Sequence, residues 1–196
     1  MEAFLVSLGV VAVSEIGDKT QLLARLLAAR FKRPGPIIAG IFLATIFNHA
    51  AAGMAGGWVA ANVDPTWLRW GLGLLFIAMG AWALIPDKLE EETGIKDAAT
   101  AMGIFWITTV SFFIAEIGDK TQIATAALAA RMDSIVLVVA GTTAGMLLAD
   151  VPAVYLGRLA TEKLHSPWVR YVAAAIFAGM GVLTLMADGL DGLWKS

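Results

Sequence analysis

The chain has 196 residues, of which 59% are hydrophobic and 15% charged, and its mean hydropathy is +0.76. A water-soluble domain of this size has no core large enough to hide so much apolar surface, so the composition predicts a membrane protein. The net charge of -2, without any basic run interleaved with aromatic residues, argues against nucleic acid as a partner. With no cysteine and two histidines, a bound metal ion would be held mainly by oxygen atoms.

Hydrophobic segments long enough to cross about 30 Å of hydrocarbon, roughly 20 residues each, occur six times along the chain. They lie at residues 3–29, 36–61, 67–86, 102–130, 135–158 and 168–187. We interpret the first as part of the mature protein, because it has no basic residues before its apolar core and leads into Glu15 and Asp18. The sequence therefore predicts an all-α polytopic membrane protein with six transmembrane helices.

An internal repeat relates the two halves of the chain. The heptapeptide Glu15–Gln21 recurs unchanged as Glu116–Gln122, an offset of 116 - 15 = 101 residues. The same offset holds outside the motif and relates, for example, Trp67 to Trp168. Because three spans in each half is an odd number, the second half should enter the bilayer in the opposite sense from the first. This arrangement of inverted repeats is typical of secondary transporters.

The predicted organisation is a first three-helix repeat at residues 1–86, an acidic cytoplasmic linker at 87–101 and a second three-helix repeat at 102–196. The orientation follows from the Lys and Arg residues of the loops, which are in excess on the cytoplasmic side. Eight of these residues lie in the loops after the first, third and fifth spans, against three on the other side. Both termini are therefore expected to lie outside.

Each copy of the repeated motif places two acids inside an apolar segment, where an ionisable group costs several kcal/mol unless it is paired, hydrated or bound to an ion. Glu15 and Asp18 are three residues apart, so in a helix they would share one face. Their equivalents in the second copy are Glu116 and Asp119. The glycine between the acids favours either close helix packing or a break in the helix. We predict that these four carboxylates bind a metal ion.

The charges of the two motifs indicate a divalent cation. The four acids carry -4 and Lys19 and Lys120 carry +2, so one divalent cation would bring the sum of -4 + 2 = -2 to zero. Protons would occupy the same oxygens when the metal is absent, and this competition is the physical basis of antiport. Oxygen ligands suit Ca²⁺, Mn²⁺ and Mg²⁺ alike, so ligand type does not separate these three ions.

Other polar residues of the motifs are candidates for supporting roles. Additional neutral oxygen atoms are expected from Gln21 and Gln122, as further metal ligands, and from Thr20 and Thr121. An ammonium group cannot ligate a metal, so the two lysines are expected to position and tune the acids.

A second group of candidates lies in the second and fifth spans. Asp150 lies two residues before Pro152 and is, by the 101-residue offset, the equivalent of His49, which follows Asn48. A buried aspartate beside a helix-kinking proline is typical of a functional residue in a membrane, either a metal ligand or a proton relay. His49 is either a proton relay or a packing residue, and Asn48 is either functional or bonded to a neighbouring helix.

Three alternatives stay open. A structural one pairs Glu15 with Lys19, four residues along the same helix, but it leaves Asp18 unpaired. An exporter of an amino acid or another organic solute would need a site balanced in charge, with an apolar lining. An intramembrane hydrolase with paired carboxylates would need further catalytic groups, which the sequence does not offer, so the chain is not expected to be an enzyme.

Paired Glu-x-Gly-Asp-Lys-Thr motifs in the first and fourth spans of a small six-span protein resemble those of the manganese/calcium cation exporter family. This family has Golgi, chloroplast and bacterial members and is part of the lysine-exporter superfamily. Both motifs are intact, and the resemblance covers nearly the whole chain. It implies export of Mn²⁺, with Ca²⁺ as an alternative, in exchange for protons, with the motif acids as ligands and no prosthetic group. The short length is similar to that of prokaryotic members of the family, so the protein is expected in the inner (cell) membrane of a prokaryote.

Overall fold

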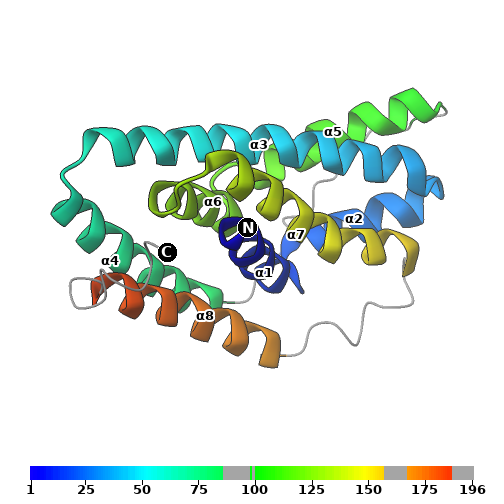
Figure 1. The fold of residues 1–196 in the computed structure, drawn as a ribbon. Helices are drawn as coiled ribbons and strands as arrows, with labels where there is room; N and C mark the ends of the chain where they lie inside the picture. The colour runs from blue at the N-terminus through cyan, green and yellow to red at the C-terminus, as the bar shows by residue number, and fades with distance from the viewer. Residues whose placement is uncertain (86–97, 99, 157–166, 187–196) are drawn as a thin grey trace.

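The computed structural model describes residues 1–85, 98, 100–156 and 167–186, and these residues form eight helices and no strand (Figure 1). The helices of the first half are α1 (Glu2–Glu15), α2 (Lys19–Phe31), α3 (Pro34–Asn62) and α4 (Pro65–Ala83). Those of the second half are α5 (Ala101–Glu116), α6 (Lys120–Arg131), α7 (Ile135–Leu156) and α8 (Pro167–Leu185). The predicted all-α fold is confirmed for the described part of the chain.

Four of the predicted spans correspond to the single helices α3, α4, α7 and α8, with boundaries that differ by a few residues. The segments predicted as spans at 3–29 and 102–130 are each interrupted in the structure. The first segment divides into α1 and α2, and the second into α5 and α6, which are bent by 70° at their junction. In each case the chain leaves the helix at the glycine of the repeated motif.

Among the described residues, three helices, α3, α7 and α8, are by length and composition apolar enough to cross a membrane, and α5 with α6 adds a fourth if the bent pair is one span. The 29 residues of α3 extend over about 43 Å, more than a bilayer core requires. By contrast, α1 and α2 have 14 and 13 residues and are too short to cross alone. Most of the predicted acidic linker, and five of the basic residues that predicted the orientation, lie outside the described residues.

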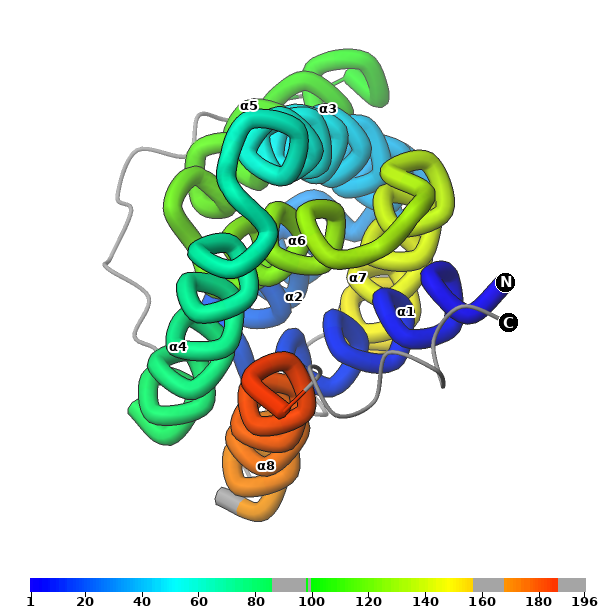
Figure 2. Tube along the Cα trace, turned by 60° about the vertical axis from the view of Figure 1, so that its left-hand side comes forward, coloured from blue at the N-terminus to red at the C-terminus, as the bar shows by residue number. Residues whose placement is uncertain are grey.

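The two halves are interlocked rather than side by side. Helix α1 packs mainly against α7 and also touches α6 and α8, all in the second half, whereas α5 packs against α3 and α2 in the first. Figure 2 shows α1 beside α7 and α5 beside α3. The last helices of the halves, α4 and α8, pack against each other. Each half therefore supplies a helix that completes the packing of the other half.

Glycines at these contacts show that the packing is reciprocal. A Cβ atom at Gly40 on α3 would lie 2.8 Å from the carbonyl oxygen of Phe105 on α5. A Cβ at Gly141 on α7 would meet the carbonyl oxygen of Phe4 on α1, closer still. Both pairs of equivalent residues differ by 101 positions, because 141 - 40 = 105 - 4 = 101. The same surfaces thus meet twice, as a two-fold relation between the halves requires.

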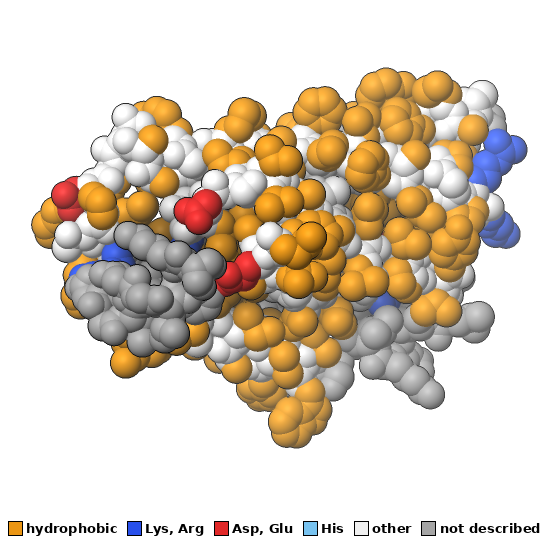
Figure 3. Space-filling model, viewed as in Figure 1, with side chains coloured by type: hydrophobic (Ala, Val, Ile, Leu, Met, Phe, Trp, Pro, Cys, Tyr) orange, Lys and Arg blue, Asp and Glu red, His pale blue; other side chains and the backbone are white. Residues whose placement is uncertain are grey.

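The outer surface is apolar, as expected for a protein surrounded by lipid. Hydrophobic side chains cover most of the face seen in Figure 3, and a group of Lys and Arg side chains lies at the end where α2 joins α3. Large aromatic residues are among the most exposed, including Phe47 at 60%, Trp58 at 68% and Trp67 at 75%. A soluble monomer rarely exposes an apolar surface of this extent, so the surface agrees with a membrane location.

Candidate metal-binding site

Both copies of the motif lie at helix breaks. Helix α1 ends at Glu15 and α2 begins at Lys19, so Glu15 and Asp18 do not share a helical face, and that interpretation is wrong. The alternative, a break at the glycine, is confirmed. Gly17 has φ of 84° and Gly118 has φ of 74°. Because side chains with a Cβ atom disfavour this left-handed region, glycine is the residue that lets the chain turn here.

Replacement of Gly118 by alanine is expected to lower the free energy of unfolding by about 1–2 kcal/mol, the cost of a left-handed conformation for an L-residue. No atom lies within 4 Å of the position that the new Cβ would take, so the penalty comes from the backbone alone. Thermal unfolding of the purified protein in detergent would measure it. The control is Gly179→Ala, which has equally open space on helix α8 and is expected to stabilise by about 0.5–1 kcal/mol. Equal changes in stability in the two variants would contradict the conclusion that the left-handed backbone at Gly118 requires glycine.

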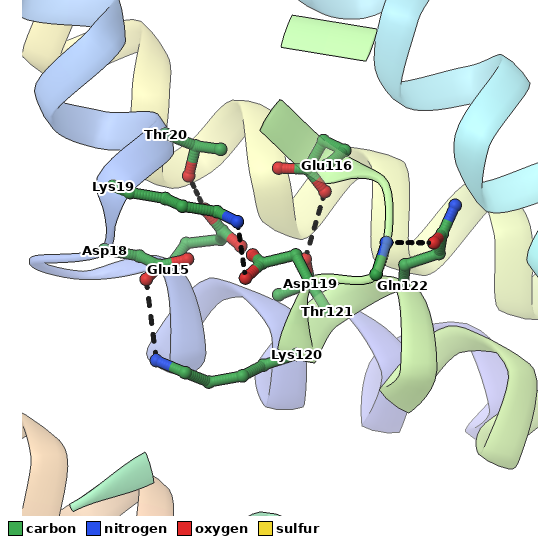
Figure 4. Close-up of polar contacts among 10 residues, drawn as sticks. Glu15, Asp18, Lys19, Thr20, Glu116, Asp119, Lys120, Thr121 and Gln122 are labelled. Atoms are coloured by element: carbon green, nitrogen blue, oxygen red, sulfur yellow. Dashed lines mark hydrogen bonds and ion pairs between the residues drawn. The ribbon is translucent and has the colours of Figure 1, made fainter. Parts of the chain in front are cut away.

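The motif glutamines hold the breaks in place. The amide oxygen of Gln21 accepts a hydrogen bond from the Gly17 N–H at 3.0 Å, and that of Gln122 accepts from the Gly118 N–H at 2.8 Å. Figure 4 shows Gln122 turned away from the carboxylates. The amide nitrogen of Gln21 donates to the carbonyl oxygen of Ala149 on α7, at 3.1 Å. The structure therefore gives the glutamines a structural role, and metal ligation by them stays a prediction.

Carboxylates of both motifs meet in the centre of the molecule. One oxygen each of Glu15, Asp18 and Asp119 lies within 4.8 Å of the other two, and all three residues are buried. Glu116 is fully buried as well but lies outside this group of three. Thr20 donates to Oε2 of Glu15 at 2.5 Å, and Thr121 makes the equivalent bond to Glu116 at 3.1 Å. The threonines thus hold one oxygen of each glutamate.

The lysines connect the two motifs to each other. Nζ of Lys19 lies 3.1 Å from Oδ1 of Asp119, and Nζ of Lys120 lies 3.6 Å from Oδ1 of Asp18 (Figure 4). The alternative in which Lys19 neutralises Glu15 within one helix is therefore wrong, because its ion pair crosses to the other half. The exchange of partners follows the two-fold relation of the helices. The predicted role of the lysines in positioning the acids agrees with these contacts.

Several carboxylate oxygens of this site lack a hydrogen-bond partner within the described residues. They are Oε1 of Glu15, Oε1 of Glu116 and Oδ2 of Asp119. A buried anionic oxygen without a donor is costly, so a site that holds several of them favours a cation. The remaining charge of -2, from four acids and two lysines, matches one divalent ion.

The second group of predicted residues, Asp150, Asn48 and His49, occupies different surroundings in the structure. Asp150 on α7 is fully buried and follows Ala149, whose carbonyl oxygen accepts a hydrogen bond from Gln21 of the first motif. Asn48 instead donates to the carbonyl oxygen of Phe113 at 3.2 Å and links α3 to α5. His49 is fully buried, and neither ring nitrogen has a hydrogen-bond partner in the part of the chain that the structure describes.

A further charged residue, Arg25, contacts the first motif and was not among the site residues predicted from the sequence. Arg25 on α2 is 4% exposed, and its Nη2 donates to the amide oxygen of Gln21 at 2.9 Å. It also interacts electrostatically with Asp150. The available signal was an arginine in the middle of an apolar segment, one helical turn after Gln21.

A polytopic helical protein that buries a cluster of carboxylates between two broken helices belongs to the class of membrane cation transporters. Within this class, the family described as "Divalent cation/proton antiporter GDT1" matches residues 3–91 and 104–191, and the chain belongs to this family. The family resemblance and the predicted divalent-cation transport are thereby confirmed. Because the family consists of transporters, the chain is not an enzyme.

Relatives from bacteria and plants match almost the whole chain. The chain is 48% identical over 185 residues to a protein of Vibrio cholerae serotype O1 named "Putative manganese exporter", covering 94% of this chain and 90% of that protein. It is 29% identical over 193 residues to a GDT1-like protein of Synechocystis, covering 90% and 93%. GDT1-like protein 3 of Oryza sativa is 28% identical over 208 residues, covering 92% and 72%. No solved structure matches the chain.

Proposed function

We propose that this protein exports Mn²⁺ in exchange for protons, with Ca²⁺ as an alternative cargo. The observation that carries the proposal is the buried group of Glu15, Asp18 and Asp119, whose oxygens lie within 4.8 Å of one another. Oxygen atoms alone suit Mn²⁺ and Ca²⁺, whereas Zn²⁺ and Cu²⁺ favour nitrogen or sulfur. The name of the relative in Vibrio cholerae supports the choice of Mn²⁺.

We assign direct metal contact to the four motif acids, with Glu116 joining the group of three when the cation is bound. The threonines fix the glutamate oxygens that face them, and the lysines keep the aspartates of the two motifs together. The glutamines stabilise the helix breaks that bring the acids into one place. Protons and the cation compete for the same carboxylate oxygens, and this competition couples their opposite movements.

We further propose that the chain has six spans, arranged as two inverted three-span repeats. In this arrangement α1 with α2, and α5 with α6, each form one broken span. The reciprocal contacts of Gly40 and Gly141 support a two-fold axis between the halves, which lies in the membrane plane when the repeats are inverted. The excess of basic residues in the loops supports an orientation with both termini outside and the central linker in the cytoplasm of a prokaryotic cell.

Flux measurements in proteoliposomes test this function. With an imposed pH gradient, we expect uptake or release of Mn²⁺ that depends on the gradient and stops when an ionophore dissipates it. Mn²⁺ at about 100 times its Kd should also stabilise the protein by about 2.7 kcal/mol. Well-folded protein that moves neither Mn²⁺ nor Ca²⁺ would contradict the proposal and favour the export of an organic solute.

A further inference from the structure

Arg25 connects the first helix break to a helix of the other half. Its Nη2 donates to the amide oxygen of Gln21 at 2.9 Å, and the same oxygen accepts the N–H of Gly17 at 3.0 Å. The amide nitrogen of Gln21 donates to the carbonyl oxygen of Ala149 on α7, at 3.1 Å. One continuous set of hydrogen bonds thus joins Gly17 at the break, Gln21 and Arg25 on α2, and Ala149 on α7.

Asp150, next to Ala149, supplies the opposite charge. The two side chains interact electrostatically, and both oxygens of Asp150, like Nε and Nη1 of Arg25, have no hydrogen-bond partner in the described part of the chain. A buried charge is stable only with a counter-charge nearby. When this pair is added to the four acids and two lysines, the summed formal charge is -5 + 3 = -2. The net charge that a divalent cation would neutralise is therefore unchanged.

The two charged residues that form this brace are not repeated at the second break. The 101-residue offset places Ala126 at the position of Arg25 and His49 at the position of Asp150, so this pair of opposite charges is not repeated at the second break. Gln122 still accepts from the Gly118 N–H, but alanine cannot donate to Gln122. Burial of the equivalent residues differs in the same direction, since Gln21 is buried whereas Gln122 is half-buried, and Ile16 is half-buried whereas Ile117 is exposed.

We propose that Arg25 is a positioning residue that fixes the first break against α7, so that the second break is the part of the site that rearranges when the cation binds or leaves. The inference about rearrangement rests on the proposed function, whereas the brace itself does not. The brace acts through Gln21 and touches no carboxylate of the metal site. Transport by this chain is then asymmetric, although its two motifs are identical in sequence.

Hydrogen–deuterium exchange of the purified full-length protein, read by mass spectrometry on peptides that contain Gly17 or Gly118, tests the brace. In the wild type we expect slower exchange at the first break than at the second. In Arg25→Met, exchange at the first break should rise about tenfold, as expected when a charge-assisted hydrogen bond that limits local opening is lost. Arg25→Lys, which keeps the charge, should recover part of the protection.

The matched control is Arg30→Met, which removes an exposed arginine from the same helix and should leave both breaks unchanged. Unaltered exchange at the first break in Arg25→Met would overturn the brace. So would a rise that extends equally over α8 and the second break, since that indicates a general loss of stability. Added Mn²⁺ should slow exchange mainly at the second break. If Mn²⁺ protects neither break, the proposed function fails, while the comparison of metal-free variants still decides the brace.

Discussion

Replacement of Glu15 or Glu116 by glutamine is expected to reduce Mn²⁺ flux driven by a pH gradient at least about 100-fold, because each change removes a charged ligand of the proposed metal site. Both residues are fully buried, and each holds one oxygen on a threonine and has the other without a hydrogen-bond partner among the described residues. Glutamine keeps the shape and can still accept from the threonine. Transport should therefore be lost while the fold remains.

The measurement is flux into proteoliposomes at matched protein content, with size-exclusion profiles and thermal unfolding as evidence of folding. The comparison variant is Lys19→Arg, which keeps the positive charge that faces Asp119 at 3.1 Å and should stay within about tenfold of wild type. Wild-type flux in either glutamine variant would disprove a shared role of the two glutamates. A loss as large in Lys19→Arg would mean that the geometry of the ion pair matters as much as the ligands.

Replacement of Gly56 by valine is expected to destabilise the protein by about 3 kcal/mol or more and to abolish transport. A Cβ atom at this position on α3 would overlap the carbonyl oxygen of Ala126 on α6 and would lie 2.7 Å from its carbonyl carbon. Both are backbone atoms, so the two helices must separate. Helix α6 begins directly after Asp119, so its displacement also moves a carboxylate of the site.

Thermal unfolding and flux of this variant can be compared with those of Gly71→Ala. Gly71 lies on α4 with no atom within 4 Å of the position of its Cβ, so this substitution should leave transport close to wild type and, like Gly179→Ala, stabilise the protein by about 0.5–1 kcal/mol. A Gly56→Val protein with normal stability would show that α3 and α6 do not pack as closely as described.

The sequence predicted much of the architecture because duplication leaves a direct record. An offset of 101 residues relates the motifs, and the helices follow in the same order in both halves. The breaks were only one of two readings, because a glycine between helical residues is compatible with either a continuous or a broken helix. The positive φ of Gly17 and Gly118, which decides the matter, results from packing in three dimensions.

The contacts within the site could be predicted less completely. The acids were identified from their position in apolar segments, but their partners depend on which helices adjoin. Lys19 pairs with Asp119 across the halves, whereas sequence spacing favours Glu15. The proposed role of Arg25 depends on the packing of α2 against α7, and Asp150 on α7 lies 150 - 25 = 125 residues further along the chain. A local sequence pattern does not show which side chains from distant segments come into contact.

The interlocked packing also has a consequence for how the protein is made. Helix α1 is among the first parts of the chain to be synthesised, yet in the described structure its main neighbours are α7, α6 and α8, all in the second half. Until α7 has been translated and inserted, Glu15 and the close-packing surface of α1 lack their final partners. Assembly of the site must therefore follow the synthesis of nearly the whole chain, and a ribosome that stops after α4 would release a half-protein with one motif and no completed core.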